Sequence, residues 1–523
     1  MLSHSPTRNF HFSSLHLFSL IFTGILILHG PLLRLPFFWD EAGFYVPAAW
    51  DLAHFHSLIA RTTMDTGHPP LPAAYLAFWL GISGWKPAVA RIAMLLLGAF
   101  ALTNVFLLAR RVASLGVAVA STIAAAMFPV IFVQSSLAHA DLPAAAFALW
   151  GIRLSVERRL WLSQLAFSLA VLSKETAVIT PIALAAWEIL ISPESKDFGR
   201  KVRTALVRLI PALPLAVWLL YHHHVTGRFF GNADFYQYNV TSAVNPLRIV
   251  LAFCLRLWHL LGFMNMLALT AAMAVAMWLP PVRDDDGEER PRIAIPTQLM
   301  FAFVMLAHVV TFSIVGGALL TRYLLPAYPL VIIVGMSTLR RRVARWEWPA
   351  AVIVICFALG LFFDPPYRIA PEDNLAYRDF VQLHVRAASF LQQHEQGATV
   401  LTAWPATDEL TRTYLGYTKQ PVPVIKIENF SIEEILKARA MASQYQVACL
   451  FSTKYEHPTW FFTRLWEKFS LRYFDYHADL QPELAASILH GKIVYLARAQ
   501  AEWVAIVELE EPGTSAEAHS ADY

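Results

Sequence analysis

The sequence has little charge for its length. Of its 523 residues, 15% are charged, whereas 57% are hydrophobic and 13% are aromatic, and the mean hydropathy is +0.47. Soluble domains carry about 25% charged residues, so this chain lacks the polar side chains needed to cover a surface in water. Disorder is excluded as well, because it requires many charges and few aromatic residues. The composition indicates an integral membrane protein with one soluble portion.

Cysteine is also scarce. The three cysteines, Cys254, Cys356 and Cys449, lie far apart in the sequence. Their spacing predicts neither a disulfide framework nor a metal-binding cluster. The formal net charge of +3 is mild, which excludes the strongly basic surface typical of nucleic-acid-binding proteins.

Long apolar runs fill the first two thirds of the chain. A run approaching the thickness of a hydrocarbon core, about 30 Å, predicts a membrane span. We predict eleven spans, several of them short: 15–33, 88–109, 112–134, 142–156, 160–173, 176–191, 205–221, 263–280, 297–315, 323–339 and 348–363. The stretch 247–261 contains two arginines and a histidine, so we expect an amphipathic helix at the outer interface there, not a span.

Basic residues set the expected orientation. Four clusters fall on one side of this threading: 110–111, 158–159, 196–203 and 340–345. The excess of Lys and Arg on cytoplasmic loops identifies that side as the cytoplasm. The opposite side receives residues 34–87 and, because the number of spans is odd, everything after Asp364.

The composition changes after Asp364-Pro365-Pro366. Short apolar strands are predicted at 399–403, 422–427, 447–451, 493–497 and 504–509, with charged helical stretches between them. This alternation predicts a small α/β domain. We therefore predict a transmembrane domain over 1–363, an extracytoplasmic α/β domain over 364–511 and a disordered tail over 512–523.

Two adjacent acids, Asp40 and Glu41, follow the first predicted span. They come directly after Phe37-Phe38-Trp39, at the depth of the membrane interface. Ionised groups near a membrane are costly to bury, so such residues tend to be paired, wet or functional. The alternative is an ordinary helix start, where acids are favoured in the first turn.

A second motif favours a functional role for Asp40 and Glu41 over an ordinary helix start. About 25 residues later the chain reads His68-Pro69-Pro70-Leu71, and Arg91 opens the next span. In this order, on one side of the membrane, these features resemble the protein O-mannosyltransferase and aminoarabinose transferase group of the membrane glycosyltransferase C (GT-C) fold. One feature differs, because the aminoarabinose transferases carry Glu-Lys where this chain has Gly67-His68.

The resemblance implies a fold and an activity. The fold is a mainly α, polytopic GT-C helix bundle. The activity is inverting transfer of a hexosyl or pentosyl group from a polyprenyl-phosphate donor to a hydroxyl of a protein, lipid or glycan. The protein would lie in the bacterial inner membrane, with its active site and C-terminal domain facing the periplasm.

The resemblance also assigns roles to the two acids. Asp40 corresponds to the catalytic base, and a positioned carboxylate can accept the proton of an attacking hydroxyl. Glu41 would orient the acceptor, hold the sugar or help to bind a metal. No cofactor is certain, although Asp40 and Glu41 could hold a divalent metal.

Further residues are candidates for substrate binding. Arginine binds phosphate bidentately and stays charged, which suits Arg322 to the donor phosphate, although such a residue can also simply snorkel to the interface. Lys174 could reach the same phosphate, but a mutual ion pair with Glu175 is the favoured interpretation. The predicted donor-phosphate ligands are Arg322, Lys174 and His68, and the predicted substrate-binding residues are Asp141, Tyr45 and Tyr323.

Two of these assignments have plain structural alternatives. Asp141 precedes Leu-Pro and could simply cap a helix. The run His222-His223-His224 invites a metal interpretation, but steps of about 100° scatter consecutive residues around a helix. An interfacial polar cluster is the favoured interpretation of these histidines.

Two other function classes compete with the enzyme. A secondary transporter would also be polytopic, but it should show inverted repeats and helices broken near the midplane, which we do not find in the sequence. The second rival is a non-catalytic membrane protein that binds a sugar or a lipid through its C-terminal domain.

The predicted orientation is testable by labelling. In a variant without its three native cysteines, we introduce a single cysteine at Ser57 or at Ser431. A membrane-impermeant maleimide should reach both positions from the outer side of sealed vesicles, because both follow an odd number of predicted spans. Labelling of the two positions from opposite sides would contradict the topology.

Overall fold

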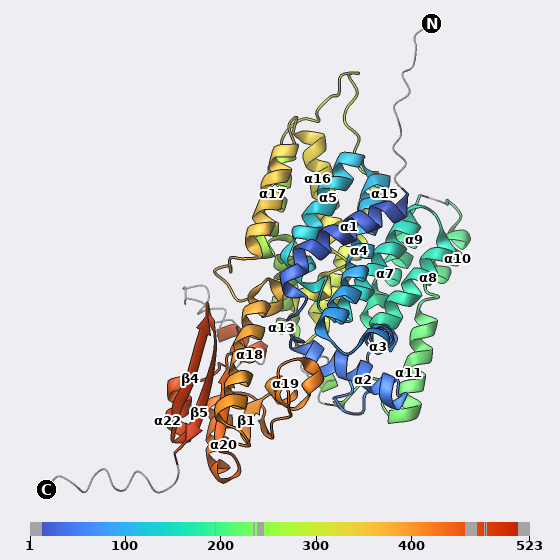
Figure 1. Ribbon diagram of the computed structural model, residues 1–523. Coiled ribbons are helices and arrows are strands. Elements are labelled where there is room, and N and C mark those ends of the chain that lie inside the picture. The colour runs from blue at the N-terminus through green and yellow to red at the C-terminus, as the bar shows by residue number, and fades with distance from the viewer. Residues whose placement is uncertain are drawn as a thin grey trace, which may run out of the picture.

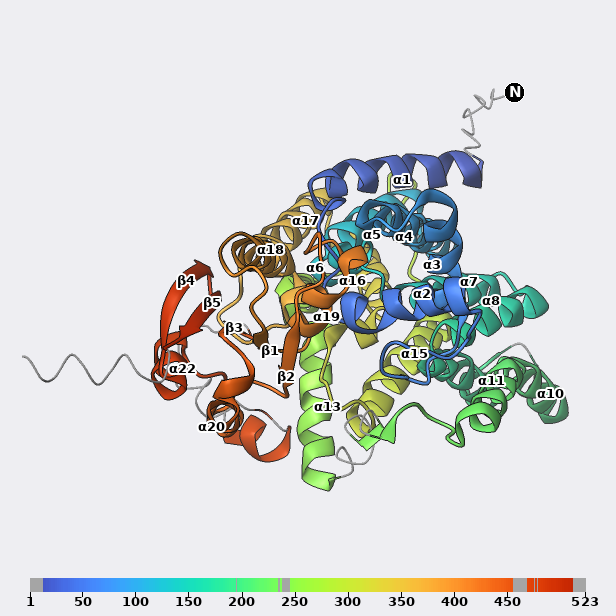
Figure 2. The same cartoon turned by 60° about the horizontal axis from the view of Figure 1, so that its bottom comes forward.

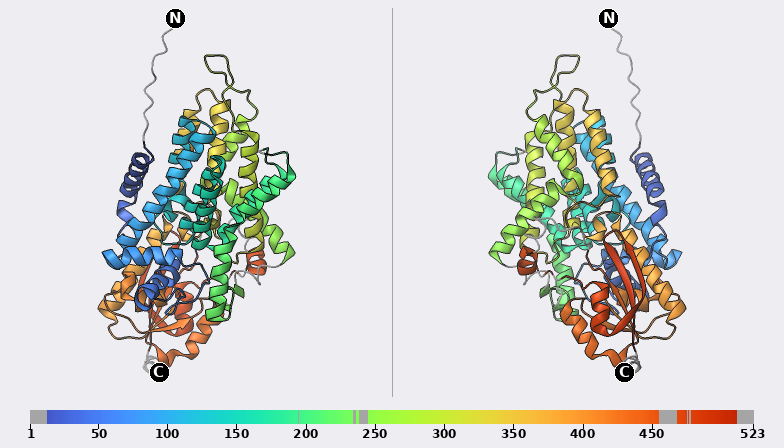
Figure 3. Two further views of the ribbon diagram at one scale, coloured as in Figure 1. Left: turned by 90° about the vertical axis from the view of Figure 1, so that its right-hand side faces the viewer. Right: turned by 90° about the vertical axis from the view of Figure 1, so that its left-hand side faces the viewer.

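The computed structural model describes residues 13–193, 195–233, 236–237, 245–454, 468–474, 476 and 478–510. The predicted disordered tail over 512–523 lies outside these residues. Figure 1 shows a bundle of long helices with a small sheet at one end. The two side views show many of the longer helices running side by side along the length of the molecule (Figure 3).

Helices make up most of the described chain up to residue 360. Their bounds are α1 Ser14–His29, α2 Val46–Phe55, α3 Leu71–Ser83, α4 Pro87–Val112, α5 Leu115–Met127, α6 Pro129–Gln134, α7 Asp141–Val156, α8 Leu160–Ser173, α9 Ile179–Leu190, α10 Phe198–Arg208, α11 Ala212–Thr226, α13 Pro246–Leu261, α14 Met266–Ala276, α15 Ile295–Ile314, α16 Tyr328–Arg342 and α17 Glu347–Gly360.

The central helix α4 illustrates why these segments are helical. Its 26 residues begin with Pro87 and end with Arg110, Arg111 and Val112. Proline suits the first helical position, and cations near the last turn interact favourably with the helix dipole. Most of the side chains between these ends are apolar and buried against neighbouring helices.

By length and composition, four described helical stretches are long and apolar enough to cross a membrane. They are Ser14–Leu32, Pro87–Val112, Pro246–Ala276 and Ile295–Ile314, and α10 with α11 makes a fifth if their 40° bend belongs to one span. Four shorter apolar helices, α3, α5, α8 and α17, accompany them. The eleven predicted spans therefore stay a prediction.

The stretch 247–261 forms α13, but its polar face does not turn to water. Arg248 donates to the carbonyls of Gly316 and Gly317, and Arg256 donates to those of Phe312 and Leu320. Both guanidinium groups are buried. Carbonyls of the chain therefore replace water as the acceptors for these arginines, and the placement of the helix at the outer interface stays a prediction.

All five predicted strands are present. They are β1 Val400–Ala403, β2 Val424–Ile427, β3 Val447–Phe451, β4 Gly491–Ala499 and β5 Glu502–Leu509, in the order β2-β1-β3-β5-β4. β1 pairs in parallel with β2 and β3, whereas β5 pairs antiparallel with β3 and β4. Four helices accompany the sheet: α18 Ala376–His394, α19 Ala406–Thr411, α20 Ile432–Ala440 and α22 Pro482–Leu489.

The sheet shares a hydrophobic core with the segment that follows α1. Phe37 and Phe38 are fully buried in the same cluster as β1, β3 and β5. The backbone N–H of Phe37 donates to the carbonyl of Leu415, and the hydroxyl of Tyr417 donates to the carbonyl of Phe37. Figure 2 shows α2 and α19 near one another at this junction. Residues about 380 positions apart are thereby fixed together.

One close helix contact allows a stability test. A Cβ at Gly151 of α7 would lie 2.4 Å from the ring of Phe167 in α8. We expect Gly151→Ala to lower the thermal midpoint in detergent, since overpacking costs about 1–3 kcal/mol. Gly24→Ala in α1, where nothing lies within 4 Å, is the matched control and should leave the midpoint unchanged or raise it slightly. Equal midpoints for the two variants would contradict this account of the contact.

Candidate active site

A cavity of about 650 Å³ lies where the helix bundle meets the C-terminal part of the chain. Six of the eight predicted site residues line it: Asp40, Tyr45, His68, Lys174, Arg322 and Tyr323. They come from four separate stretches of the sequence. Asp141 contacts two of these residues from behind the wall, and Glu41 lies outside the lining.

Asp40 is held at the start of an unusual turn. The backbone of Trp39 has a positive φ of 46°, and a single π-helical turn over Glu41–Tyr45 follows before α2 begins. These features turn the chain sharply as it leaves the first helix. The Asp40 carboxylate accepts a hydrogen bond from Arg322 and keeps 15% of its side-chain surface exposed to the cavity.

Glu41 points the other way and is completely enclosed. Both of its oxygens accept from the guanidinium of Arg91, with Nη2 to Oε2 at 2.8 Å, and both side chains are fully buried. The backbone N–H groups of Phe38 and Ala138 donate to the same carboxylate. All hydrogen-bonding capacity of Glu41 is therefore used inside the protein, which makes it an anchor for the turn that carries Asp40.

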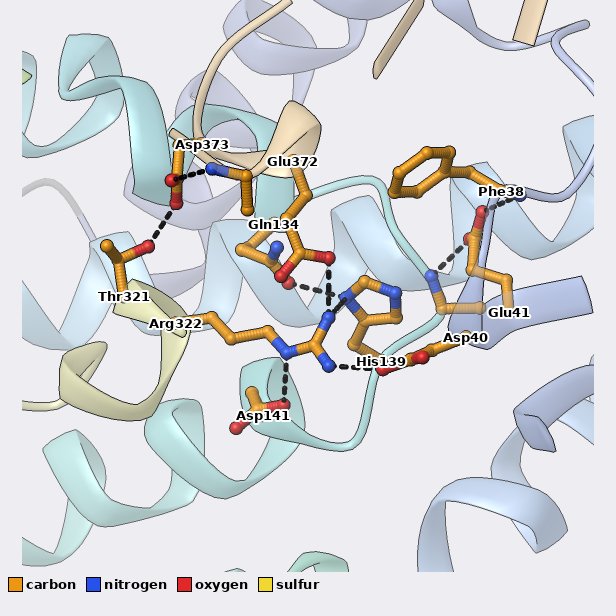
Figure 4. A network of polar contacts seen from close by, with 12 residues as sticks. Phe38, Asp40, Glu41, Gln134, His139, Asp141, Thr321, Arg322, Glu372 and Asp373 are labelled. Carbon is orange, nitrogen blue, oxygen red and sulfur yellow. Dashed lines mark hydrogen bonds and ion pairs between the residues drawn. The ribbon is translucent and has the colours of Figure 1, made fainter. Parts of the chain in front are cut away.

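Arg322 is the centre of the polar network in Figure 4. Its guanidinium contacts three carboxylates: Asp40, Asp141 with Nε to Oδ2 at 3.3 Å, and Glu372 with Nη1 to Oε2 at 2.5 Å. The preceding residue, Thr321, donates to Asp373. Burial by itself lowers the pKa of Arg322, but the surrounding acids outweigh it and hold that pKa well above its ordinary value.

Burial has the opposite consequence for the two acids beside it. It raises the pKa of Glu372 to about 8, although the positive charge of Arg322 works against this rise. It also raises the pKa of Asp373 to about 6, against hydrogen bonds from Thr321 and from the backbone of Ala370. A carboxyl whose pKa is raised is neutral at a pH where an exposed one is ionised.

Lys174 and Glu175 do not pair with each other, so the favoured interpretation of that dipeptide is wrong. Lys174 Nζ contacts Asp141 Oδ1 at 2.6 Å, whereas Glu175 Oε2 contacts His68 Nδ1 at 2.8 Å. The chain is extended at Lys174, between α8 and a short 3-10 turn, which sends the two side chains to different partners. Burial favours the neutral form of Glu175, but His68 lowers its pKa overall.

Two tyrosine rings contact Lys174 and His68. The ammonium of Lys174 lies 4.4 Å from the centre of the Tyr323 ring, a cation–π distance. The Tyr45 ring stacks on His68, with ring centres 6.0 Å apart.

His222 is buried and contacts Asp65 at 2.8 Å, whereas His223 and His224 are exposed, so the three histidines do not converge.

The sequence did not single out Glu372 or His139 for this site. His139 is fully buried, contacts Arg322, and has its pKa lowered well below the ordinary value by burial and by that arginine. Glu372 lines the cavity from a short turn over Pro371–Asp373. The signal for Glu372 was a pair of acids just after the last predicted span, on the same side as the pair after the first span.

No metal site is found among the residues that the structure describes. No group of three or more His, Cys, Asp or Glu side chains among them is arranged to hold an ion. Glu41, the predicted partner of Asp40 for a metal, already has both oxygens bound to Arg91.

The C-terminal part of the chain completes the wall. Trp404, Thr453 and Lys454 line the cavity together with Glu372. The Trp404 ring stacks on Phe44, with ring centres 5.2 Å apart, and meets Trp39 edge-on at 5.1 Å. A Cβ on Gly43 would overlap the indole, so glycine is needed for this approach. The cavity is thus not a product of residues 1–363 alone.

Comparisons with known proteins agree with this arrangement. The model of the dolichyl-phosphate-mannose-protein mannosyltransferase family matches residues 67–219, a segment that contains His68, Asp141 and Lys174. No match to the sequence was found among curated proteins. The structure of ArnT from Cupriavidus metallidurans in the apo state is similar over 94% of this chain and 98% of that one, with a TM-score of 0.55 and 14% identity.

The predicted family resemblance is confirmed. A second ArnT structure, bound to undecaprenyl phosphate, is similar with a TM-score of 0.53 and 14% identity, covering 93% of this chain and 97% of that one. The chain therefore has an ArnT-like GT-C fold, and its apolar helices are those of a multi-pass membrane protein. The match to residues 67–219 does not include Asp40 or Arg322. These two residues are candidates because they contact each other in the wall of the cavity.

The Glu41–Arg91 pair gives a prediction that separates structure from chemistry. Glu41→Gln leaves a buried guanidinium without its counter-charge, so we expect a loss of about 3–5 kcal/mol in stability, measured by thermal or denaturant unfolding. The double variant Glu41→Gln/Arg91→Gln should recover part of that loss, because the unpaired charge is gone. Full stability of Glu41→Gln with a loss of activity would instead assign Glu41 to the chemistry.

Proposed function

We propose that the protein is an inverting glycosyltransferase that moves a monosaccharide from a polyprenyl-phosphate donor to an acceptor hydroxyl. One observation carries the proposal: Asp40 and Arg322 touch each other in the wall of a 650 Å³ cavity. A carboxylate that can accept a proton thereby lies next to a cation that can bind a phosphate. Lys174 adds a second cation to the same wall.

The proposed reaction is a single displacement. The acceptor oxygen forms a bond to the anomeric carbon, the bond between that carbon and the phosphate oxygen breaks, and the hydroxyl proton passes to Asp40. Arg322 and Lys174 stabilise the charge that develops on the leaving polyprenyl phosphate. The configuration inverts because attack comes from the side opposite to the phosphate.

Donor binding would free the base. In the described structure the Asp40 carboxylate accepts a hydrogen bond from Arg322. A donor phosphate that binds Arg322 takes over part of this contact. The Asp40 carboxylate is then available to the acceptor hydroxyl, so the donor binds before the acceptor is deprotonated.

His68 and Glu175 have a supporting role in this proposal. Glu175 accepts from Nδ1 of His68 and so fixes the orientation of the ring in the cavity wall. His68 then presents its other nitrogen to the sugar or its phosphate. This pair would stand in for the lysine that the aminoarabinose transferases carry at the position of His68.

The apolar part of the cavity suits a polyprenyl chain. Phe312, Val315, Leu319 and Leu320 line it beside Arg322. The ArnT structure with a similar fold binds undecaprenyl phosphate, which supports a donor of that class here. The site would face the periplasm from the bacterial inner membrane, in line with the arginine bias, and residues 364–511 would form a periplasmic domain.

Purified protein in detergent tests the activity directly. It is incubated with a panel of radiolabelled polyprenyl-phosphate sugars, and release of polyprenyl phosphate is followed by thin-layer chromatography with and without membrane extract as the acceptor source. Turnover of at least one donor supports the proposal. If the protein neither binds nor turns over any donor in the panel, the proposal is contradicted.

Asp40→Asn tests the base. The amide cannot accept a proton, so we expect transfer to fall by about 10²–10⁴-fold while the donor still binds Arg322. Asp197→Asn, on an exposed N-terminal cap of α10, is the matched control and should transfer at the normal rate. A normal transfer rate in Asp40→Asn would show that Asp40 is not the base. Loss of donor binding in this variant would instead indicate that Asp40 has a purely structural role.

A further inference from the structure

The wall around Arg322 holds more negative than positive charge. Three carboxylates, Asp40, Asp141 and Glu372, contact the guanidinium, and Lys174 contacts Asp141. If all three acids are ionised, two cations face three anions. A polyprenyl-phosphate sugar is a phosphodiester, which carries one negative charge at any pH above about 2. Its arrival would place two uncompensated negative charges in a buried wall, which is costly.

Glu372 differs from the other two acids. Asp141 lies between two cations, Arg322 and Lys174. Asp40 is the most exposed of the three. Glu372 has one cationic partner, a side chain that is 5% exposed, and a buried Oε1 that has no hydrogen-bond partner among the described residues. That oxygen is suited to carry a proton, which removes the charge without breaking a hydrogen bond.

We propose that Glu372 is a donor-site residue that is protonated when the donor is bound, so that binding of the phosphodiester to Arg322 takes up a proton wherever Glu372 is ionised in the free protein. The inference rests on the proposed function, because it needs a phosphate at Arg322. No covalent step is involved, and the proton comes from solvent. Neutral Glu372 remains next to the guanidinium as a positioning group, while the phosphate provides the negative charge.

Glu372 has several charged and titratable neighbours. They line the same cavity, contact Arg322, or lie at the start of α18, which packs against the turn that carries Glu372: Arg322, Tyr323, Asp40, Tyr45, His68, His139, Asp141, Lys174, Glu175, Tyr236, Asp373, Tyr377, Arg378, Asp379 and Lys454. Burial lowers the pKa of His139 and raises the pKa values of Tyr45 and Tyr377. It raises the pKa of Asp373 to about 6 and that of Glu372 to about 8.

The sign of the pH dependence follows from these directions. Below pH 8 Glu372 is already protonated, so donor affinity is at its plateau. Above pH 8 each further pH unit makes protonation tenfold less favourable. We therefore expect affinity to fall about tenfold from pH 7 to pH 9, with uptake of about 0.8 proton per donor bound at pH 8.5.

The experiment uses the full chain in detergent and a probe without a sugar. Methyl undecaprenyl phosphate is a phosphodiester that carries the polyprenyl chain and a single negative charge, and it does not titrate between pH 7 and pH 9. Its dissociation constant is measured at pH 7, 8 and 9 for the native protein, for Glu372→Gln and for Glu433→Gln. Glu433 lies on α20 and is exposed, so this control makes the same chemical change away from the cavity.

The expected result is a tenfold loss of affinity from pH 7 to pH 9 in the native protein and in Glu433→Gln. Glu372→Gln, which stays neutral, should bind with equal affinity at all three values. Titration calorimetry of the native protein at pH 8.5, in buffers of different ionisation enthalpy, measures the proton uptake independently. That measurement tests the coupling even if Glu372→Gln does not fold.

Two outcomes overturn different claims. Binding by the native protein that is independent of pH, or a pH dependence that persists in Glu372→Gln, overturns the coupling and leaves the proposed function intact. Absence of binding at every pH contradicts the proposed donor class, and the coupling is then lost with it.

Discussion

The site depends on the burial of one guanidinium. Arg322 is 4% exposed, and a cation removed from water in this way costs several kcal/mol unless acids compensate it. The acids come from three distant places: Asp40 follows α1, Asp141 begins α7, and Glu372 follows α17. Packing these segments correctly is therefore tied to the pairing of Arg322. In the proposed function, the pairing that organises the site is rearranged when the donor phosphate binds.

Local patterns predicted much of the architecture, for identifiable reasons. The five strands lie where short apolar runs are separated by charged stretches, since alternation of this kind is a property of neighbouring residues. Asp40 and Arg322 could be singled out as candidates because each is a charge beside an apolar run. Partners could not be predicted in this way. Glu41 binds Arg91 50 residues away, and Arg322 binds Asp40 282 residues away.

The helix boundaries show a second limit. Hydropathy averages over a window and cannot detect breaks such as the one between α13 and α14, where Met264 and Asn265 have positive φ angles. It also cannot tell what an arginine faces. Arg248 and Arg256 were the reason to expect an interfacial helix and not a span, and both donate to backbone carbonyls of the loop before Arg322. A polar side chain can donate its hydrogen bond to a carbonyl of the chain as well as to water.

The distance in sequence between Asp40 and Arg322 has a consequence for biosynthesis. At 5–20 residues per second, the ribosome takes roughly 14–56 s to add the 282 residues that separate them. Throughout this interval the segment 34–87 is already made, but the arginine and the acid Glu372 are not. A nascent chain therefore has no complete cavity, and Asp40 lacks the guanidinium that it contacts in the finished protein.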